Sequence, residues 1–187
     1  MKVMTVFGTR PEAIKMCPVI HQLKRQQNIE CSVCLTGQHE EMLNQVMESF
    51  HIDADYNLHV MTQGQTLALV SGKIMEKLTR VYNTERPDIV LVHGDTTSSY
   101  IAALCAFYLH IPVGHVEAGL RTYNMQSPFP EEFNRRSIDL IAEIYFAPTE
   151  LAKKNLLAEN VDEQKIFVTG NTAIDALGMT IKESYSN

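Results

Sequence analysis

Three acidic residues stand where strand ends or helix starts could bring them to one edge of a sheet. Glu117 closes an apolar run, and a carboxylate there is costly unless it is paired or faces a cleft. Asp95 follows another apolar run, although its side chain could instead cap a helix that begins near Thr97. Glu131 opens a helical pattern, where the helix dipole favours a carboxylate, so it could serve only as a cap. Carboxylates gathered in one cleft could remove and return a proton.

Basic residues accompany these acids. Arg10 and Lys15 follow the first apolar run, and Thr9 and Glu12 have the spacing of a capping box at a helix start. A helix N-terminus favours an anion, so Arg10 is expected to bind one. Lys15 could equally be a solvated charge.

A second basic group belongs to the segment around Glu131. Arg135 lies four residues after Glu131, on the same helix face, and is expected to orient it as an ion pair. No cluster has the spacing of metal ligands, so no metal is expected. Isolated histidines that could be framework residues lie near the expected strand ends, at His39, His93 and His115.

The elements that must position these groups alternate regularly. Strand patterns cover 2–7, 29–35, 88–93, 111–117, 144–147 and 165–169, and helical patterns cover 13–23, 40–50, 65–82, 97–109, 133–141, 149–158 and 173–184. This order predicts an α/β fold, a doubly wound parallel sheet with helices on both faces. Ligands then bind beyond the carboxyl ends of the strands. Two helices are defined by apolar stripes of Met42, Leu43, Val46 and Phe50, and of Leu67, Leu69, Val70, Ile74, Leu78 and Val81.

Composition excludes several classes of protein. The 187 residues are 45% hydrophobic with a net charge of -6 and no basic run, which argues against nucleic acid as a partner. No apolar stretch approaches a membrane span of about 18 residues, and the N-terminus lacks a signal-peptide layout, so a cytoplasmic protein is expected. Cys31 and Cys34 fall on opposite faces of a strand, which disfavours a redox or zinc site. The turn at Gly8 lacks the other glycines of a dinucleotide fingerprint, so no nicotinamide cofactor is indicated.

Six motifs in order carry a resemblance over residues 1 to about 180. They are GTRPEAIK at 8–15, TGQH at 36–39, HGDT at 93–96, HVEAGLR at 115–121, PEEFNR at 130–135 and VTGNT at 168–172. Together they resemble the bacterial non-hydrolysing UDP-N-acetylglucosamine 2-epimerases.

The resemblance implies one Rossmann-like half of a glycosyltransferase-B-type two-domain fold. It implies cofactor-free interconversion of UDP-GlcNAc and UDP-ManNAc, by elimination of UDP to 2-acetamidoglucal and re-addition, in a homodimer that serves cell-envelope polysaccharide biosynthesis. Residues 1–172 are then the N-terminal domain and 173–187 begin a linker helix. The C-terminal UDP-binding domain has no counterpart in the chain, which is expected to be inactive by itself. By motif, the catalytic residues are Asp95, Glu117 and Glu131, and the substrate-binding residues are Arg10, Lys15, Asp95, Glu117 and Arg135.

Some positions of the family bind a second UDP-GlcNAc as an activator. They correspond to Gln38, Glu41, Gly64 and Glu131, and the residues at 41 and 64 depart from the usual glutamine and arginine, so allosteric control is not expected. Two other functions stay open. One is a non-catalytic module that binds a nucleotide sugar or a partner, and the other is a glycosyltransferase or hydrolysing epimerase of the same architecture.

Overall fold

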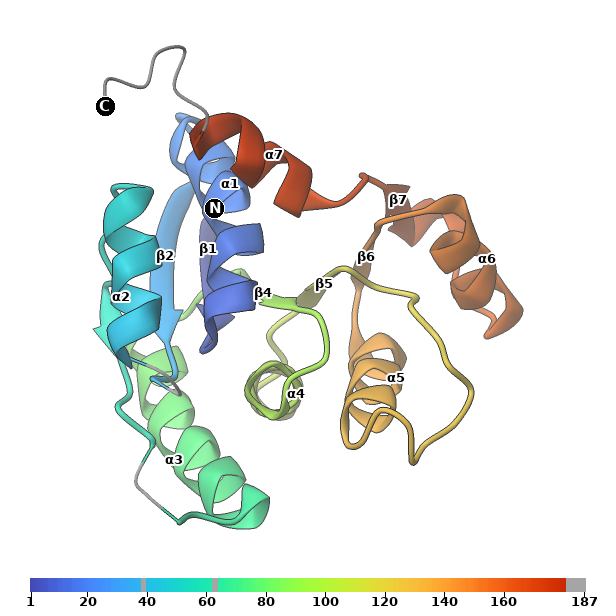
Figure 1. Ribbon diagram of the computed structural model, residues 1–187, viewed down its shortest axis with the longest axis horizontal. Coiled ribbons are helices and arrows are strands. Elements are labelled where there is room, and N and C mark those ends of the chain that lie inside the picture. Colours follow the sequence, from blue (N-terminus) through green and yellow to red (C-terminus); the bar gives the residue numbers. More distant parts are fainter. Residues whose placement is uncertain (38–39, 62–63, 181–187) are drawn as a thin grey trace, which may run out of the picture.

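A computed structural model describes residues 1–37, 40–61 and 64–180 of the chain (Figure 1). In this part of the chain seven strands form one parallel sheet in the order β3-β2-β1-β4-β5-β6-β7. The strands are β1 (Lys2–Phe7), β2 (Glu30–Leu35), β3 (Tyr56–Asn57), β4 (Ile89–His93), β5 (Val113–Val116), β6 (Ile144–Ala147) and β7 (Ile166–Val168). The predicted parallel α/β sheet is therefore confirmed, and only the two-residue edge strand β3 was not expected from the sequence.

Helices cover both faces of the sheet. On one face α1, α2 and α7 share a core with β1 and β2, and Figure 1 shows α7 running beside α1. On the other face α3 to α6 enclose a second core centred on Ile74, Leu78 and Ile138. The helices are α1 (Arg10–Lys24), α2 (Glu40–Ser49), α3 (Leu67–Glu85), α4 (Thr97–Tyr108), α5 (Glu131–Ile141), α6 (Glu150–Ala158) and α7 (Thr172–Thr180), with a 3₁₀ turn at Glu163–Lys165.

The start of α1 follows directly from its sequence. Thr9 caps the helix. Its hydroxyl accepts the amide hydrogen of Glu12, and the Glu12 carboxylate accepts the amide hydrogen of Thr9. The predicted capping box is therefore confirmed. Because it fixes the first turn, α1 begins at Arg10 and not at Ala13.

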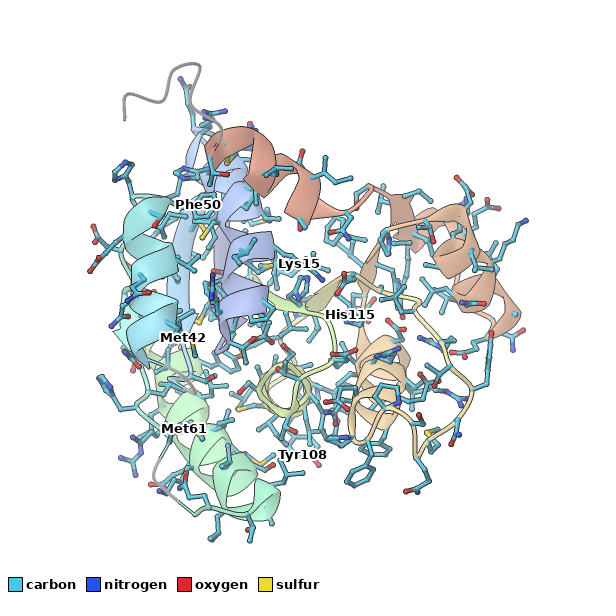
Figure 2. All side chains as sticks on the ribbon, in the orientation of Figure 1. Lys15, Met42, Phe50, Met61, Tyr108 and His115 are labelled. Carbon is cyan, nitrogen blue, oxygen red and sulfur yellow. The ribbon has the colours of Figure 1, made fainter. Side chains whose placement is uncertain are left out.

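Three residues of the expected apolar stripes are not in the core. Met42 on α2 is 47% exposed, and Leu67 and Leu69 at the start of α3 are also exposed. Figure 2 shows Met42 and Phe50 at opposite ends of α2, and it is Phe50 that is buried against α1. Periodicity alone predicted all three to be in the core, but it does not show which turns of a helix another element covers.

The cysteines are free thiols held mostly in apolar surroundings. Cys17 and Cys34 are buried, and burial raises the pKa of each thiol to about 12. Cys31 is less buried than Cys34, as expected for opposite faces of β2. Over residues 1–37, 40–61 and 64–180, no three His, Cys, Asp or Glu side chains could hold a metal ion. No helix in the same ranges is long and apolar enough to cross a membrane.

Candidate active site

A cleft of about 410 Å³ lies at the carboxyl ends of β1, β4 and β5. Parallel pairing brings these ends together, because Val6 of β1 is in register with Val92 of β4, which is in register with His115 of β5. The cleft is lined by Thr9, Pro11, Glu12, Lys15, His93, Gly94, Asp95, Thr96 and Glu117. Three of the predicted site residues, Lys15, Asp95 and Glu117, therefore share one cleft.

Glu117 and Lys15 form the most direct ion pair of this cleft. Lys15 Nζ lies 2.5 Å from Glu117 Oε1, with the side chains 24% and 16% exposed. In Figure 2, Lys15 projects from α1 toward the interior of the molecule, on the side where His115 lies. Lys15 is thus a partner of Glu117 and not only a solvated charge.

The backbone of Glu117 is unusual for a residue with a side chain. Its φ is +70°, in the left-handed region that favours glycine, while its amide donates to the Phe146 carbonyl oxygen at 3.0 Å. Such a conformation is strained and persists only where the surroundings enforce it, often at functional sites. Here it turns the chain sharply after β5 and directs the carboxylate into the cleft.

Asp95 does not cap the next helix. Thr96 does so, since its hydroxyl accepts the Ser99 amide hydrogen at 3.1 Å. The Asp95 carboxylate instead pairs with Arg135 of α5. The side-chain amide of Asn134, also on α5, donates to the Asp95 carbonyl oxygen. Helix α5 therefore holds the loop that carries Asp95.

The expected ion pair between Glu131 and Arg135 is wrong. The guanidinium of Arg135 reaches Asp95 instead and lies 3.5 Å from a carboxylate oxygen of buried Glu132. The spacing of four residues allowed a local pair, but Arg135 turns toward the cleft, where Asp95 needs a partner.

Two predicted site residues stand apart from this cleft. Glu131 at the start of α5 and Arg10 at the start of α1 do not line it, and neither side chain makes a hydrogen bond or ion pair within the described ranges. Both could therefore meet a ligand that extends beyond the cleft. Gln38 and the side chain of Glu41 lie outside the described residues, and Gly64, with φ +77°, has open space around it.

Three buried carboxylates at or near the cleft have long-range partners that the sequence did not indicate. The first is Glu12, which is almost fully buried. Its Oε2 accepts from the Gly8 amide and from the Thr9 amide and hydroxyl, and its Oε1 accepts from the Thr96 and Ser99 hydroxyls at 2.6 and 2.7 Å. The capping box was readable, but the contacts to α4 join residues more than 80 positions apart. Glu12 thus fixes the start of α1 to the start of α4.

The second buried carboxylate is Glu132. It accepts the amide hydrogens of Thr122 and Tyr123, each at 3.0 Å, and so holds the loop between β5 and α5. Burial by itself would raise the pKa of Glu132, but these donors and Arg135 outweigh burial and lower the pKa below its ordinary value.

The third is Asp139, which joins two strand-end loops. Its carboxylate accepts from His115 Nδ1 at 2.6 Å, the Gly119 amide at 3.1 Å and Arg121 Nη1 at 2.7 Å. Burial would raise the pKa of Asp139, but His115 and Arg121 outweigh burial and lower it. His115 Nε2 lies 2.7 Å from the Gly94 carbonyl oxygen, which can only accept, so the ring donates on both sides. The loops that carry Asp95 and Glu117 are therefore locked to one buried ion pair.

The resulting cleft holds two partly exposed carboxylates, Glu117 and Asp95, each with a cation from a different helix. Groups of this kind can accept or donate a proton at a bound small molecule, while the cations orient the carboxylates. Two such carboxylates in one cleft suit chemistry in which a proton is removed and another is returned.

Comparisons with known proteins agree on one family. A family model described as UDP-N-acetylglucosamine 2-epimerase matches residues 21–187. The UDP-N-acetylglucosamine 2-epimerase of Bacillus subtilis is 54% identical over 187 residues, which is 100% of this chain and 49% of that protein. A crystal structure of UDP-GlcNAc 2-epimerase from Neisseria meningitidis bound to UDP-GlcNAc superposes with a TM-score of 0.94 at 55% identity, covering 96% of this chain and 48% of that one.

A more distant likeness concerns the fold only. MurG of Acinetobacter baumannii has a TM-score of 0.61 at 18% identity, over 80% of this chain and 42% of that one. The chain spans about half the length of the curated relatives it matches.

Proposed function

The chain belongs to the UDP-N-acetylglucosamine 2-epimerase family, and we propose that it is the N-terminal half of an enzyme that interconverts UDP-GlcNAc and UDP-ManNAc. The observation that carries the proposal is the cleft in which Glu117 pairs with Lys15 and Asp95 pairs with Arg135. The matched relatives bear the name of this activity, and the Neisseria meningitidis structure is bound to UDP-GlcNAc.

The chemistry of the reaction accounts for two carboxylates. The C2 proton of the sugar is not acidic, so a base must remove it as the bond from C1 to the phosphate oxygen breaks. The electron pair of the C2–H bond forms the C1=C2 bond of 2-acetamidoglucal, and the electron pair of the C1–O bond leaves with UDP. Re-addition of UDP with a proton delivered to the other face of C2 inverts that centre. Asp95 and Glu117 supply these proton transfers, with Glu131 as a third acid at the rim.

Cations complete the site. Lys15 and Arg135 orient the two carboxylates, and Arg10, exposed at the N-terminus of α1, is placed to meet the phosphates of UDP. Elimination and re-addition leave the oxidation state of the substrate unchanged, so the reaction requires no redox cofactor.

The complete protein has two domains in this proposal. Residues 1–172 form one wall of a glycosyltransferase-B-type cleft, α7 begins the linker within 173–187, and a second domain supplies the UDP-binding wall. The coverage of about half of each relative supports this organisation. The chain by itself is then inactive. By family likeness the complete protein is a cytoplasmic homodimer that serves cell-envelope polysaccharide biosynthesis.

Deuterium exchange tests the proposal. The chain is compared with a fusion in which it is joined to the second half of the Bacillus subtilis relative, both incubated with UDP-GlcNAc in D₂O. We expect the fusion to form UDP-ManNAc and to place deuterium at C2, and the chain alone to do neither.

Variants of the fusion assign the chemistry. Glu117→Gln is expected to abolish exchange while the circular dichroism spectrum is kept, and Glu76→Gln, on the exposed face of α3, serves as the control. Release of free ManNAc with UDP would instead indicate a hydrolysing enzyme. Binding of UDP-GlcNAc with no exchange would indicate a non-catalytic module.

A further inference from the structure

His93 is the residue of the cleft that the ion pairs described above leave without a role. It is the last residue of β4 and is only 4% exposed. Neither ring nitrogen has a hydrogen-bond partner within residues 1–37, 40–61 and 64–180. A buried polar group without a partner is unfavourable, so its retention beside two carboxylates points to a partner that is engaged during function.

The nearest acidic group to His93 is Glu117. His93 Nε2 lies 3.5 Å from Glu117 Oε2, while Lys15 holds the other oxygen, Oε1, at 2.5 Å. Gly94 follows His93 with φ +63°, and a Cβ at that position would lie 3.5 Å from the same Oε2. Oε2 thus lies close above the end of β4, within reach of the His93 ring after a small shift.

The ring of His93 is neutral, which decides what it can do. Burial, together with the positive charges of Lys15 and His115, lowers its pKa to about 3. A charged imidazole could only donate. A neutral imidazole donates or accepts at Nε2, depending on which nitrogen carries the single ring proton.

We propose that His93 is a positioning residue that holds Glu117 in both of its protonation states. When Glu117 is a carboxylate, Nε2–H of His93 donates to Oε2. When Glu117 carries a proton, Oε2–H donates to a bare Nε2 and the ring proton resides on Nδ1. The contact at Nε2 then selects the tautomer.

Lys15 determines which oxygen of Glu117 takes the proton. An ammonium group only donates, so a proton on Oε1 would face a donor, whereas a proton on Oε2 faces an acceptor. In the elimination step the C2 proton passes to Glu117, and the electron pair of the C2–H bond forms the C1=C2 bond as UDP leaves. Between the two states the ring loses one proton at Nε2 and gains one at Nδ1, so it carries no net charge in either state. This role rests on the proposed function, but the tautomer of His93 does not.

Nitrogen-15 NMR of the labelled 187-residue chain tests the contact directly. At neutral pH we expect His93 to be neutral with its proton on Nε2. Glu117→Ala should remove that preference and give a mixture of tautomers, whereas Asp95→Ala, a carboxylate of the same cleft, should leave it unchanged. A charged ring, a proton on Nδ1 in the unaltered chain, or no response to Glu117→Ala would overturn the proposal.

Kinetics of the fusion protein test the consequence for catalysis. Glutamine places its amide near the position of Nε2 and asparagine near that of Nδ1, so the two substitutions are a matched pair. We expect His93→Gln to keep at least about a tenth of kcat and His93→Asn to lose about 100-fold, with KM changed much less. Equal losses in the two variants would contradict a role for Nε2. If the unaltered fusion shows no exchange, the proposed function fails, and the NMR result still decides whether His93 holds Glu117.

Discussion

Asp139→Asn should destabilise the chain far more than the loss of a surface charge would. The Asp139 carboxylate is buried, and its partners His115, Arg121 and the Gly119 amide all donate to it. An asparagine keeps the shape but places an amide NH₂ against at least one donor and leaves buried cations without their counter-charge. Removing one partner of a buried ion pair typically costs about 3–5 kcal/mol.

Urea denaturation of the 187-residue chain measures this cost. With a dependence of about 2 kcal/mol per molar urea, the midpoint should fall by about 1.5–2.5 M. Glu76→Gln is the control, because Glu76 pairs with Arg80 on the exposed surface of α3 and its loss should change stability by less than about 0.5 kcal/mol. If the midpoint of Asp139→Asn lies within the range of that control, the buried pair contributes no more to stability than a surface charge does.

The same substitution should also loosen the cleft. Asp139 holds Gly119, two residues after Glu117, and through His115 it holds the carbonyl of Gly94, next to Asp95. Amide hydrogen exchange should therefore accelerate at residues 94–95 and 117–119 before it does so in α2, which packs in the core on the other face of the sheet. Uniform acceleration throughout the sheet would show that the pair stabilises the fold without specifically fixing the site.

Further predictions concern stability, pH and binding. Gly119→Ala should lower the free energy of unfolding by more than about 2 kcal/mol, because φ is +84° and a Cβ would lie 2.3 Å from a backbone oxygen of α6. Gly72 lies in open space on α3, so Gly72→Ala should raise the free energy of unfolding by about 0.5–1 kcal/mol in the same urea assay. Because the pKa of Glu132 is lower in the folded chain than its ordinary value of 4.5, Glu132 stabilises the fold above pH 4.5, and this stabilisation is lost as the pH falls through the folded-state pKa. In Glu132→Gln the free energy of unfolding should therefore depend less on pH at acid pH. Arg10→Ala should leave the urea midpoint unchanged but weaken UDP binding by the fusion about tenfold or more by calorimetry.

The fold was largely readable from the sequence because its signals are local. Each main strand and helix has its own apolar pattern, and the capping box of Thr9 and Glu12 lies within four residues. Glu117 was readable for a similar reason, since a carboxylate at the end of a buried strand requires a special environment. The other site residues were assigned from the motifs, because the residues around Lys15 in the sequence do not distinguish it from a solvated lysine.

Ion-pair partners that are distant in the chain could not be predicted from the sequence. Arg135 was assigned to Glu131 because sequence spacing reveals only neighbours on the same helix, and its actual partner Asp95 lies 40 residues away on another loop. One usable signal was missed, since Glu132 and Asp139 are seven residues apart, on the same face of α5. Two acids on the inner face of an amphipathic helix indicate buried contacts to backbone amides or cations.

The carboxylates of the site differ in how many hydrogen bonds their oxygens already accept. This difference distinguishes the acids that fix the loops from those that can exchange a proton with a ligand. Glu12 accepts five hydrogen bonds, and the oxygens of Glu132 and Asp139 are occupied by loop amides and buried cations. A carboxylate whose lone pairs are all engaged cannot take a proton from a substrate without breaking the structure that it supports. Asp95 and Glu117 each have one cation and one oxygen without a hydrogen bond within the described ranges, and both open into the cleft. Among the acids of the cleft, Asp95 and Glu117 are therefore the two that can take or give a proton, because the neighbouring buried acids are engaged in holding the loops that present them.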